Sequence, residues 1–214
     1  MLDITELDAV NMMLESVGET KVTSLSGTLP TDVSNAQSIL SEVDGEFQME
    51  GWSFNTRIKV TLSPSGLSPN RTFLPANAAA DAIPLMVIPR TRSKKYGIRR
   101  QTTGTGSAGY KRYYLYDINE DTDVIGSDID VDIVIGLGYE ELPHAAKNYI
   151  ARKASRLFAE RLFGEANPAL REDEARAYAA FKRYETDTMD YRMSDTYSVD
   201  RATHRISPYD NYNS

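Results

Sequence analysis

The hydrophobic pattern of the chain changes abruptly at Gly51. Before this glycine, apolar residues recur at steps of four, three and four, which is the period of a helix buried on one side. These residues are Ala36, Leu40, Val43 and Phe47. After it, every even position from Trp52 to Leu62 is apolar or Thr, and the odd positions are polar. The change predicts a helix that Gly51 ends, followed by a strand with one buried face.

The first fifty residues predict two helices. The first extends from Thr5 to Val17, and Thr5 with Asp8 forms an acidic variant of the capping box at its start. The second begins at Thr31 or Ser34 and carries the apolar residues that precede Gly51. Both helices have one apolar side, so we expect them to pack together or against other helices.

Two more helices are predicted after the strand region. One begins near Pro143, ends at Gly164 and has a broad apolar face that includes Leu162. Its opposite side carries bases, namely Lys147, Arg152, Lys153, Arg156 and Arg161. The other begins at Asn167-Pro168, an N-cap followed by a proline in the first turn. Its seam consists of Leu170, Glu174, Ala177, Phe181, Tyr184, Thr188 and Tyr191, and Glu174 interrupts the apolar run.

The centre of the chain predicts several short strands. The runs IPLMVIP, YKRYYLYDI and IDVDIVIGL are rich in β-branched or aromatic residues, and loops rich in Gly, Ser, Pro and Asn separate them. The expected fold class is α+β. An antiparallel helical bundle is built from residues 1–51 and 139–193. An antiparallel β domain, sandwich or barrel-like, is inserted at residues 52–138. Residues 194–214 lack periodicity and predict an extended C-terminal tail.

Composition narrows the functional classes. The chain of 214 residues has no cysteine, which excludes disulfides and thiolate metal sites. It has only two histidines, so we expect no His-rich zinc site, and no motif in a suitable context indicates a cofactor. The N-terminus lacks the basic segment of a signal peptide, and no apolar run approaches the length of a membrane span. The formal net charge of −7 disfavours a general nucleic-acid binder.

Charge is unevenly distributed along the centre of the chain. Residues 82–116 contain eight bases and no acid, whereas residues 117–132 contain seven acids and no base. The two blocks could pair within one sheet or between two subunits, or form a solvated loop beside an acidic hairpin. Tyrosines interleave the basic block, and this composition favours a protein interface over nucleic-acid stacking. The candidate interaction residues are Arg90, Arg92, Lys94, Lys95, Arg99, Arg100, Lys111, Arg112, Arg152, Arg156, Tyr197, Tyr209 and Tyr212.

No motif in the sequence nominates a catalytic residue. The run GTGSAG, residues 104–109, has the spacing of a dinucleotide-binding loop, but a strand-like run follows it where a helix would be required. We therefore interpret it as a loop tip. His144 lies in the first turn of a predicted helix, where a charged imidazole is disfavoured, so a structural role is expected. The carboxylates are too scattered in sequence to indicate an acid–base pair.

Three segments of the chain form a recognisable combination. They are LDAVNMMLESVGETKVTSLSG, then DVSNAQSILSEVDGEFQMEGWSFNT, and then YEELPHAAKNYIARKASRLFAERLFG followed by EDEARAYAAFKRYETDTMDYRM. The most specific pieces are Ala9-Val10-Asn11 with Gly18-Glu19, Gly51 to Asn55, Ala154 to Arg156 with Arg161 to Gly164, and Tyr184 to Asp190. Together they resemble tail tubular protein A of short-tailed, podovirus-type bacteriophages. The resemblance covers both helical ends, and the centre from Ser63 to Tyr116 is not part of it.

The resemblance implies a non-enzymatic adaptor of the virion tail, assembled in the host cytoplasm. Twelve subunits would form a ring between the portal and the tail nozzle, with a tail fibre as a further partner and no contact with a membrane. DNA would pass through the lumen during ejection without specific binding, and the C-terminal tail would reach toward the portal. Two alternatives remain at this point. One is a saccharide or peptidoglycan hydrolase that uses two carboxylates during entry, and the other is a DNA-binding module that uses the block from Arg90 to Arg112.

Overall fold

The computed structural model describes residues 3–66, 71–74, 83–91, 94–102, 111–165 and 167–193, and within them the chain has an α+β fold. The helices are α1 (Glu6–Ser16), α2 (Thr31–Met49), α3 (His144–Phe163) and α4 (Pro168–Met193). The strands are β1 (Thr56–Leu62), β2 (Ile83–Pro89), β3 (Tyr96–Thr102), β4 (Lys111–Asp117) and β5 (Ile129–Gly136). A short 3-10 helix, η1 (Tyr139–Glu141), follows β5. The α+β class is therefore confirmed.

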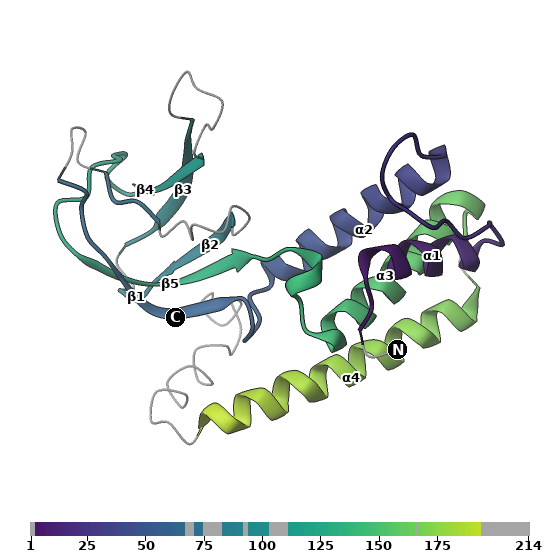
Figure 1. Cartoon of the computed structure of the whole chain (residues 1–214). Coiled ribbons are helices and arrows are strands. Elements are labelled where there is room, and N and C mark those ends of the chain that lie inside the picture. The colour runs from purple at the N-terminus through teal and green to yellow at the C-terminus, as the bar shows by residue number, and fades with distance from the viewer. Residues whose placement is uncertain are drawn as a thin grey trace.

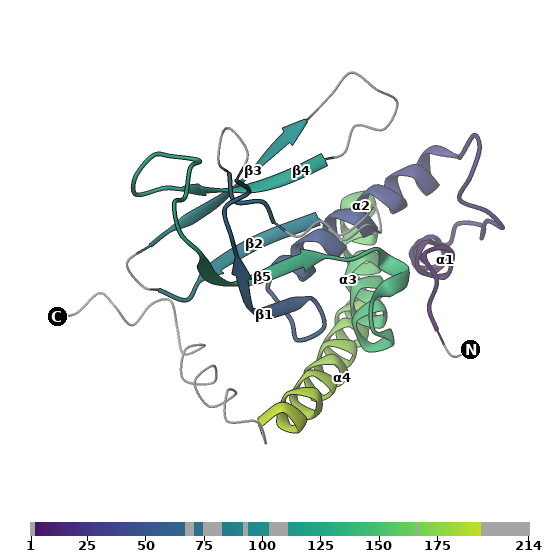
Figure 2. The same ribbon diagram turned by 60° about the vertical axis from the view of Figure 1, so that its left-hand side comes forward.

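The helices gather at one end of the molecule and the strands at the other (Figure 1). We call these parts the helical body and the β module. The chain leaves the helical body at the end of α2, forms the β module and returns through β5 and η1 to α3. Helix α4 then turns back along α3, as the two views show (Figures 1 and 2). Two segments of the chain therefore connect the two parts, one entering the β module and one leaving it.

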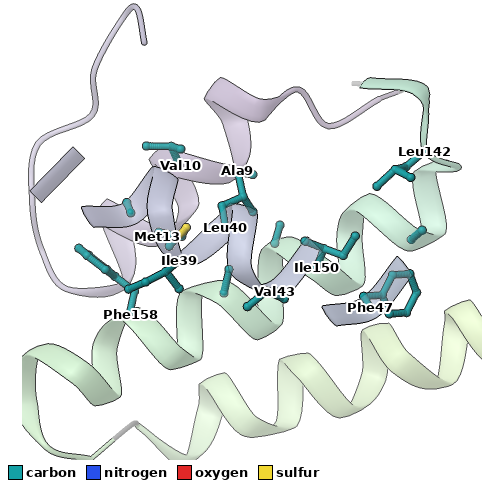
Figure 3. Packing of buried hydrophobic residues seen from close by; sticks show 14 of the residues in the cluster. Ala9, Val10, Met13, Ile39, Leu40, Val43, Phe47, Leu142, Ile150 and Phe158 are labelled. Atoms are coloured by element: carbon teal, nitrogen blue, oxygen red, sulfur yellow. The ribbon is translucent and has the colours of Figure 1, made fainter. Parts of the chain in front are cut away.

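All four helices contribute side chains to one hydrophobic core. Figure 3 shows residues of this core from α1, α2 and α3, and Phe181 is the contribution of α4. The buried side chains of α1 are Ala9, Val10, Met13 and Leu14, and α1 packs against α2 and α3. Thr5 and Asp8 cap each other reciprocally, because the Thr5 hydroxyl accepts from the Asp8 amide and the Asp8 carboxylate accepts from the Thr5 amide. The buried positions predicted for α2 are confirmed. They are Ala36, Leu40, Val43 and Phe47.

The connection from α2 to β1 differs from the sequence prediction. Gly51 adopts a φ of 74°, and a Cβ added there would lie 3.0 Å from the Val134 side chain, so only glycine fits. The strand was expected to start at Trp52, but β1 starts at Thr56. Residues between them form a turn in which the Asn55 side chain accepts from the Trp52 amide and donates to the Gln48 carbonyl. The alternation of apolar and polar residues in the sequence begins before the strand, because side chains in this turn are also buried although the turn lacks strand geometry.

The β module contains two small antiparallel sheets. In the first, β5 lies between β1 and β2, and in the second, β3 pairs with β4. Both sheets contribute to a second hydrophobic core, made of Leu62, Leu74, Val87, Leu115, Ile125, Val131 and Ile133. The described strands close no barrel, so the barrel-like alternative is wrong for the part of the chain that the structure shows. The edges of the first sheet are β1 and β2, and the pairing of each with β5 contains one register shift, where the strand bends and twists locally.

Three side chains lie on faces that the periodicity did not predict. Ile58 was expected in the buried face of β1, but it is exposed because the register shifts between Arg57 and Val60. Lys147 was expected on the solvent side of α3, yet its side chain is only 1% exposed. Leu162 was expected in the apolar face of the same helix, and it is half exposed near the free end of the helical body.

Candidate interaction surfaces

The basic block predicted from the sequence is partly neutralised within the β module. Arg90 lies 3.1 Å from Asp132 of β5. Lys94 binds Asp117 at 3.3 Å and also contacts Glu120. These contacts confirm that the basic and acidic blocks pair within one chain. They hold together the segments around β2, β4 and β5, so these two bases have a structural role in the module.

Two other bases of the block, Lys95 and Arg99, lie on one side of the β3–β4 sheet. Leu115 of β4, with Ile98 opposite it, faces the core of the module. Alternate side chains therefore point away from that core. We call this side the outer face, and it comprises Lys95, Arg99, Tyr114, Tyr116 and Ile118. The Arg99 guanidinium lies 3.3 Å from the centre of the Tyr116 ring, a stacking arrangement, and Ile118 is 54% exposed. Arg100 is also exposed, on the opposite side of β3.

A short neighbouring segment, residues 71–74, extends this sheet beside β4. Leu74 donates its amide to the Tyr113 carbonyl at 2.9 Å, and Leu115 donates to the Thr72 carbonyl at 2.9 Å. Arg71 lies 4.5 Å above the Tyr114 ring and forms an ion pair with Asp123 at 2.7 Å. The Tyr114 ring is therefore covered and only 9% exposed, whereas the Tyr116 ring beneath Arg99 is partly exposed.

The remaining candidate residues fall into two groups. Arg152 and Arg156 project from α3 toward α4, where Arg152 lies 3.3 Å from Asp173 and Arg156 binds Glu174 and Glu160. These two arginines join the helices of one chain, which also explains the acid that interrupts the seam of α4. Arg92, the GTGSAG run, Tyr197, Tyr209 and Tyr212 lie outside the described residues, as do the side chains of Lys111 and Arg112.

Two carboxylates, from Asp3 and Glu140, bind the buried amine of Lys147, and together with Glu6 and Asp44 they form a group that we call the acidic surface. Lys147 Nζ lies 2.8 Å from Asp3 and 3.3 Å from Glu140. The Glu140 carboxylate also accepts from the Glu6 amide at 2.8 Å. Burial favours a neutral amine and would lower the pKa of Lys147, but the two hydrogen-bonded carboxylates raise that pKa above its usual value. Asp44 is the fourth member: burial, with a contribution from the charge of Glu6, raises its pKa to about 6.

The junction between the helical body and the β module is built from buried polar contacts. The Gln48 side chain donates to the Leu137 carbonyl at 2.9 Å and accepts from the Leu137 amide at 2.7 Å. Glu185 of α4 is 4% exposed, and its two carboxylate oxygens accept from the amide and the hydroxyl of Ser53, each at 2.8 Å. Sequence reasoning missed Glu185, although its spacing of four from Phe181 places both side chains on one face of the helix. The predicted seam residue Tyr184 is instead 37% exposed.

A third surface lies at the end of the helical body away from the β module. Leu162 and Phe163, at the end of α3, are 50% and 63% exposed. An open groove of about 250 Å³ adjoins them between α2 and α3. Its lining residues are Asp32, Asn35, Ser38, Ile39, Phe158, Arg161 and Leu162. Large exposed apolar side chains beside a groove are typical of a contact surface for another protein.

The described residues do not suggest a metal centre or a membrane segment. They hold no group of three or more histidine or acidic side chains placed to bind a metal ion. None of the helices in the described ranges combines the length and the apolar character needed to cross a bilayer. The features that stand out are therefore surfaces: the outer face, the acidic surface and the apolar end of α3.

Comparison with known families identifies the class of protein. A family model described as tail tubular protein matches residues 7–191. The match runs from the first turn of α1 into the last turns of α4 and includes every strand of the β module. The chain therefore belongs to the tail tubular protein family, whose members are structural proteins of phage tails. This confirms the resemblance found in the two helical ends and extends it across the centre of the chain.

A comparison with individual proteins agrees with the family. The chain is similar to tail tubular protein A of Klebsiella phage KP34. The two sequences are 27% identical over 175 residues, which represent 81% of this chain and 82% of the relative. The similarity thus covers most of both proteins, including the helical body and the β module.

Proposed function

We propose that this chain is a structural adaptor of the phage tail, of which twelve copies form a ring between the portal and the tail nozzle. The ring surrounds the channel through which DNA is ejected. The observation that carries this proposal is the family match over residues 7–191, because it includes both structural parts and leaves no separate domain for another activity within the matched range. The name of the relative from phage KP34, tail tubular protein A, supports the same role.

The distribution of surfaces supports a ring. A closed ring of identical subunits requires two different lateral faces that fit each other head to tail. The chain offers unlike surfaces on its two parts, a basic and aromatic one on the β module and acidic and apolar ones on the helical body. A single subunit cannot bring these surfaces together, since its two parts lie at opposite ends (Figure 1).

The charge of the protein supports a DNA channel that does not hold its cargo. Binding of duplex DNA depends on many Lys or Arg contacts with phosphates. A net charge of −7 works against such contacts, and several of the bases are already paired with acids in the same chain. The duplex would therefore slide through the lumen without specific binding.

A catalytic step is not part of the proposal. A glycosidase requires two carboxylates that face each other across a cleft. Asp3 and Glu140 are carboxylates that the fold brings together, and both bind Lys147, so their proximity is explained by this ion pair. Glu185 is likewise occupied by two hydrogen bonds from Ser53. The hydrolase alternative has no observation in its favour among these carboxylates.

The partners follow from the position in the tail. The ring contacts its own copies, the portal on one side and the nozzle on the other, with a tail fibre as a further partner. Assembly takes place in the host cytoplasm, and the mature location is the virion tail. Residues 194–214, which lie outside the described residues, bind the portal, and the helical bodies pack side by side in the ring.

The test is a mass measurement of the purified full chain, alone and with purified portal, by sedimentation velocity. The proposal predicts a ring of twelve copies, formed either alone or on the portal. The same samples are assayed for release of sugars from host envelope saccharide and peptidoglycan. A chain that remains monomeric in both conditions, or that hydrolyses either polymer, would overturn the proposal.

A further inference from the structure

We propose that the outer face of the β3–β4 sheet docks on the acidic surface of a second copy of this chain. This inference rests on the proposed ring and specifies one of its lateral contacts. The outer face supplies Lys95, Arg99, Tyr116 and Ile118, and the acidic surface supplies Glu6, Asp44 and Glu140. The contact is heterologous, because each copy offers the outer face to one neighbour and the acidic surface to the other.

The outer face has the composition of an interface centre. Ile118 is 54% exposed, and Lys95 and Arg99 are exposed beside it. Among the described residues, neither base forms an ion pair with a carboxylate. Arg99 lies instead over the Tyr116 ring. Stacking holds the guanidinium in one orientation and leaves its edge free to donate hydrogen bonds. Aromatic residues with arginine are the side chains most enriched at protein interfaces.

Among the described residues, the acidic surface has more carboxylates than cations. The buried amine of Lys147 binds Asp3 and Glu140, and His144 lies 3.7 Å from Asp3. The Glu140 carboxylate accepts from the Glu6 amide, so Glu6 lies beside this pair. Burial raises the pKa of Asp44, and the charge of Glu6 adds to that rise because the two carboxylates repel each other. A guanidinium or ammonium group arriving from outside would offset this repulsion.

The two surfaces cannot meet within one subunit. The β3–β4 sheet lies in the β module and α1 lies in the helical body, and the two elements stand apart in both views (Figures 1 and 2). Each surface is therefore open to a partner, and the two are complementary in charge. Complementary charges on two different surfaces of one chain favour association of identical copies head to tail.

The charge of the rest of the chain favours a second copy over DNA as the occupant of the outer face. Residues 1–51 contain a single base, Lys21. Their acids number ten: Asp3, Glu6, Asp8, Glu15, Glu19, Asp32, Glu42, Asp44, Glu46 and Glu50. This acidic half repels the phosphates of a duplex that approaches the molecule, whereas it attracts the basic outer face of a neighbouring copy.

The experiment compares self-association of the full-length wild type with charge variants, by sedimentation velocity at low and high salt. Arg99→Glu places like charges opposite each other and should weaken association about 10- to 100-fold. Glu6→Lys should weaken it similarly, because it places a base opposite the bases of the outer face. Glu6 lies in the first turn of α1 and accepts a 3.5 Å hydrogen bond from Gln37, so circular dichroism should verify that this variant is folded. The double variant with both changes restores opposite charges across the contact and should recover most of the association. Arg183→Glu, an exposed base on α4, is the matched control and should associate like the wild type.

The outcomes separate this inference from the proposed function. A wild type that forms rings while Arg99→Glu forms them equally well overturns the docking contact and leaves the adaptor in place. An equal loss in Arg183→Glu, or no recovery in the double variant, also overturns it. Binding of a DNA duplex that Arg99→Glu abolishes would reassign the outer face to nucleic acid. A wild type that does not assemble, alone or with portal, overturns the proposed function itself.

Discussion

Replacement of Trp52 by Ala tests how the two parts of the molecule are joined. Trp52 is 5% exposed and lies where α2 leads into the β module. Its ring stacks on Phe47 at 5.1 Å and meets the edge of Phe181 at 4.8 Å, so it binds α2 and α4 together. The indole nitrogen also donates to the Phe47 carbonyl at 2.7 Å. One side chain therefore connects three segments of the chain.

The expected loss is about 3–5 kcal/mol of unfolding free energy, as is usual when a buried Trp becomes Ala and leaves a cavity. For a chain of this size, the loss corresponds to a fall in melting temperature of roughly 6–20 °C. Trp52→Phe keeps a stacking ring and loses the hydrogen bond, and should cost about 1–2 kcal/mol. Met49→Ala, at a neighbouring exposed position, is the control and should change stability by less than about 0.5 kcal/mol.

Unfolding should be followed by far-ultraviolet circular dichroism, because Trp52 is the only tryptophan and its removal abolishes the fluorescence signal. An unchanged melting temperature in Trp52→Ala would refute the view that this residue holds the junction. A loss as large in Met49→Ala would show that the region is sensitive to any substitution, and the packing argument would fail.

Three further predictions concern other parts of the chain. Asp44 has a folded pKa of about 6, above its ordinary value, so its contribution to stability is lost as the pH rises toward and past 6. The unfolding free energy of Asp44→Asn should therefore exceed that of the wild type by about 1–3 kcal/mol at pH 8 and equal it near pH 4. A constant difference between the two proteins across this pH range would contradict the prediction. Glu185→Ala leaves two buried donors of Ser53 unpaired and should lower the unfolding free energy, measured by urea denaturation, by about 2–4 kcal/mol. Glu185→Gln should lose about half as much. Equal urea midpoints for wild type and Glu185→Ala would disprove the contact. Deletion of residues 194–214 should leave the melting temperature unchanged and weaken attachment to the portal, and full portal binding by the shortened chain would refute that role.

The helices were predictable because their signals are local. The capping box at Thr5, the stop at Gly51 and the start at Asn167-Pro168 each depend on residues within a few positions of one another. Helical periodicity also identified the buried face of α2. In each case, interactions within one short segment determine the local structure, so it can be predicted without knowing the three-dimensional arrangement of the other elements.

The failures occurred where distant segments decide the outcome. Lys147 has the sequence context of a solvent-facing base, and it is buried only because Asp3 and Glu140 meet it from other parts of the chain. Glu185 is buried because Ser53, more than a hundred residues earlier, presents two donors to it. Periodicity describes one element at a time, and it cannot show which polar partner a different element supplies.

The candidate interaction residues were also predictable from the sequence only in part. The sequence located the basic block and its tyrosines, and composition indicated an interface. Strand pairing was needed to separate the bases that bind acids, such as Arg90 and Lys94, from those on the outer face. Neighbouring positions in the sequence alternate between the two sides of a strand, so only the register of β3 with β4 could assign Arg99 to the open side.

The most direct test of the adaptor role is electron microscopy of the purified chain bound to its portal. The account predicts a ring of twelve copies on the axis of the portal, with an open central channel wide enough for a DNA duplex. It also predicts that the β3–β4 sheet of each copy contacts the α1 region of the next. Single copies scattered on the portal surface, or a closed assembly without a central channel, would contradict the account.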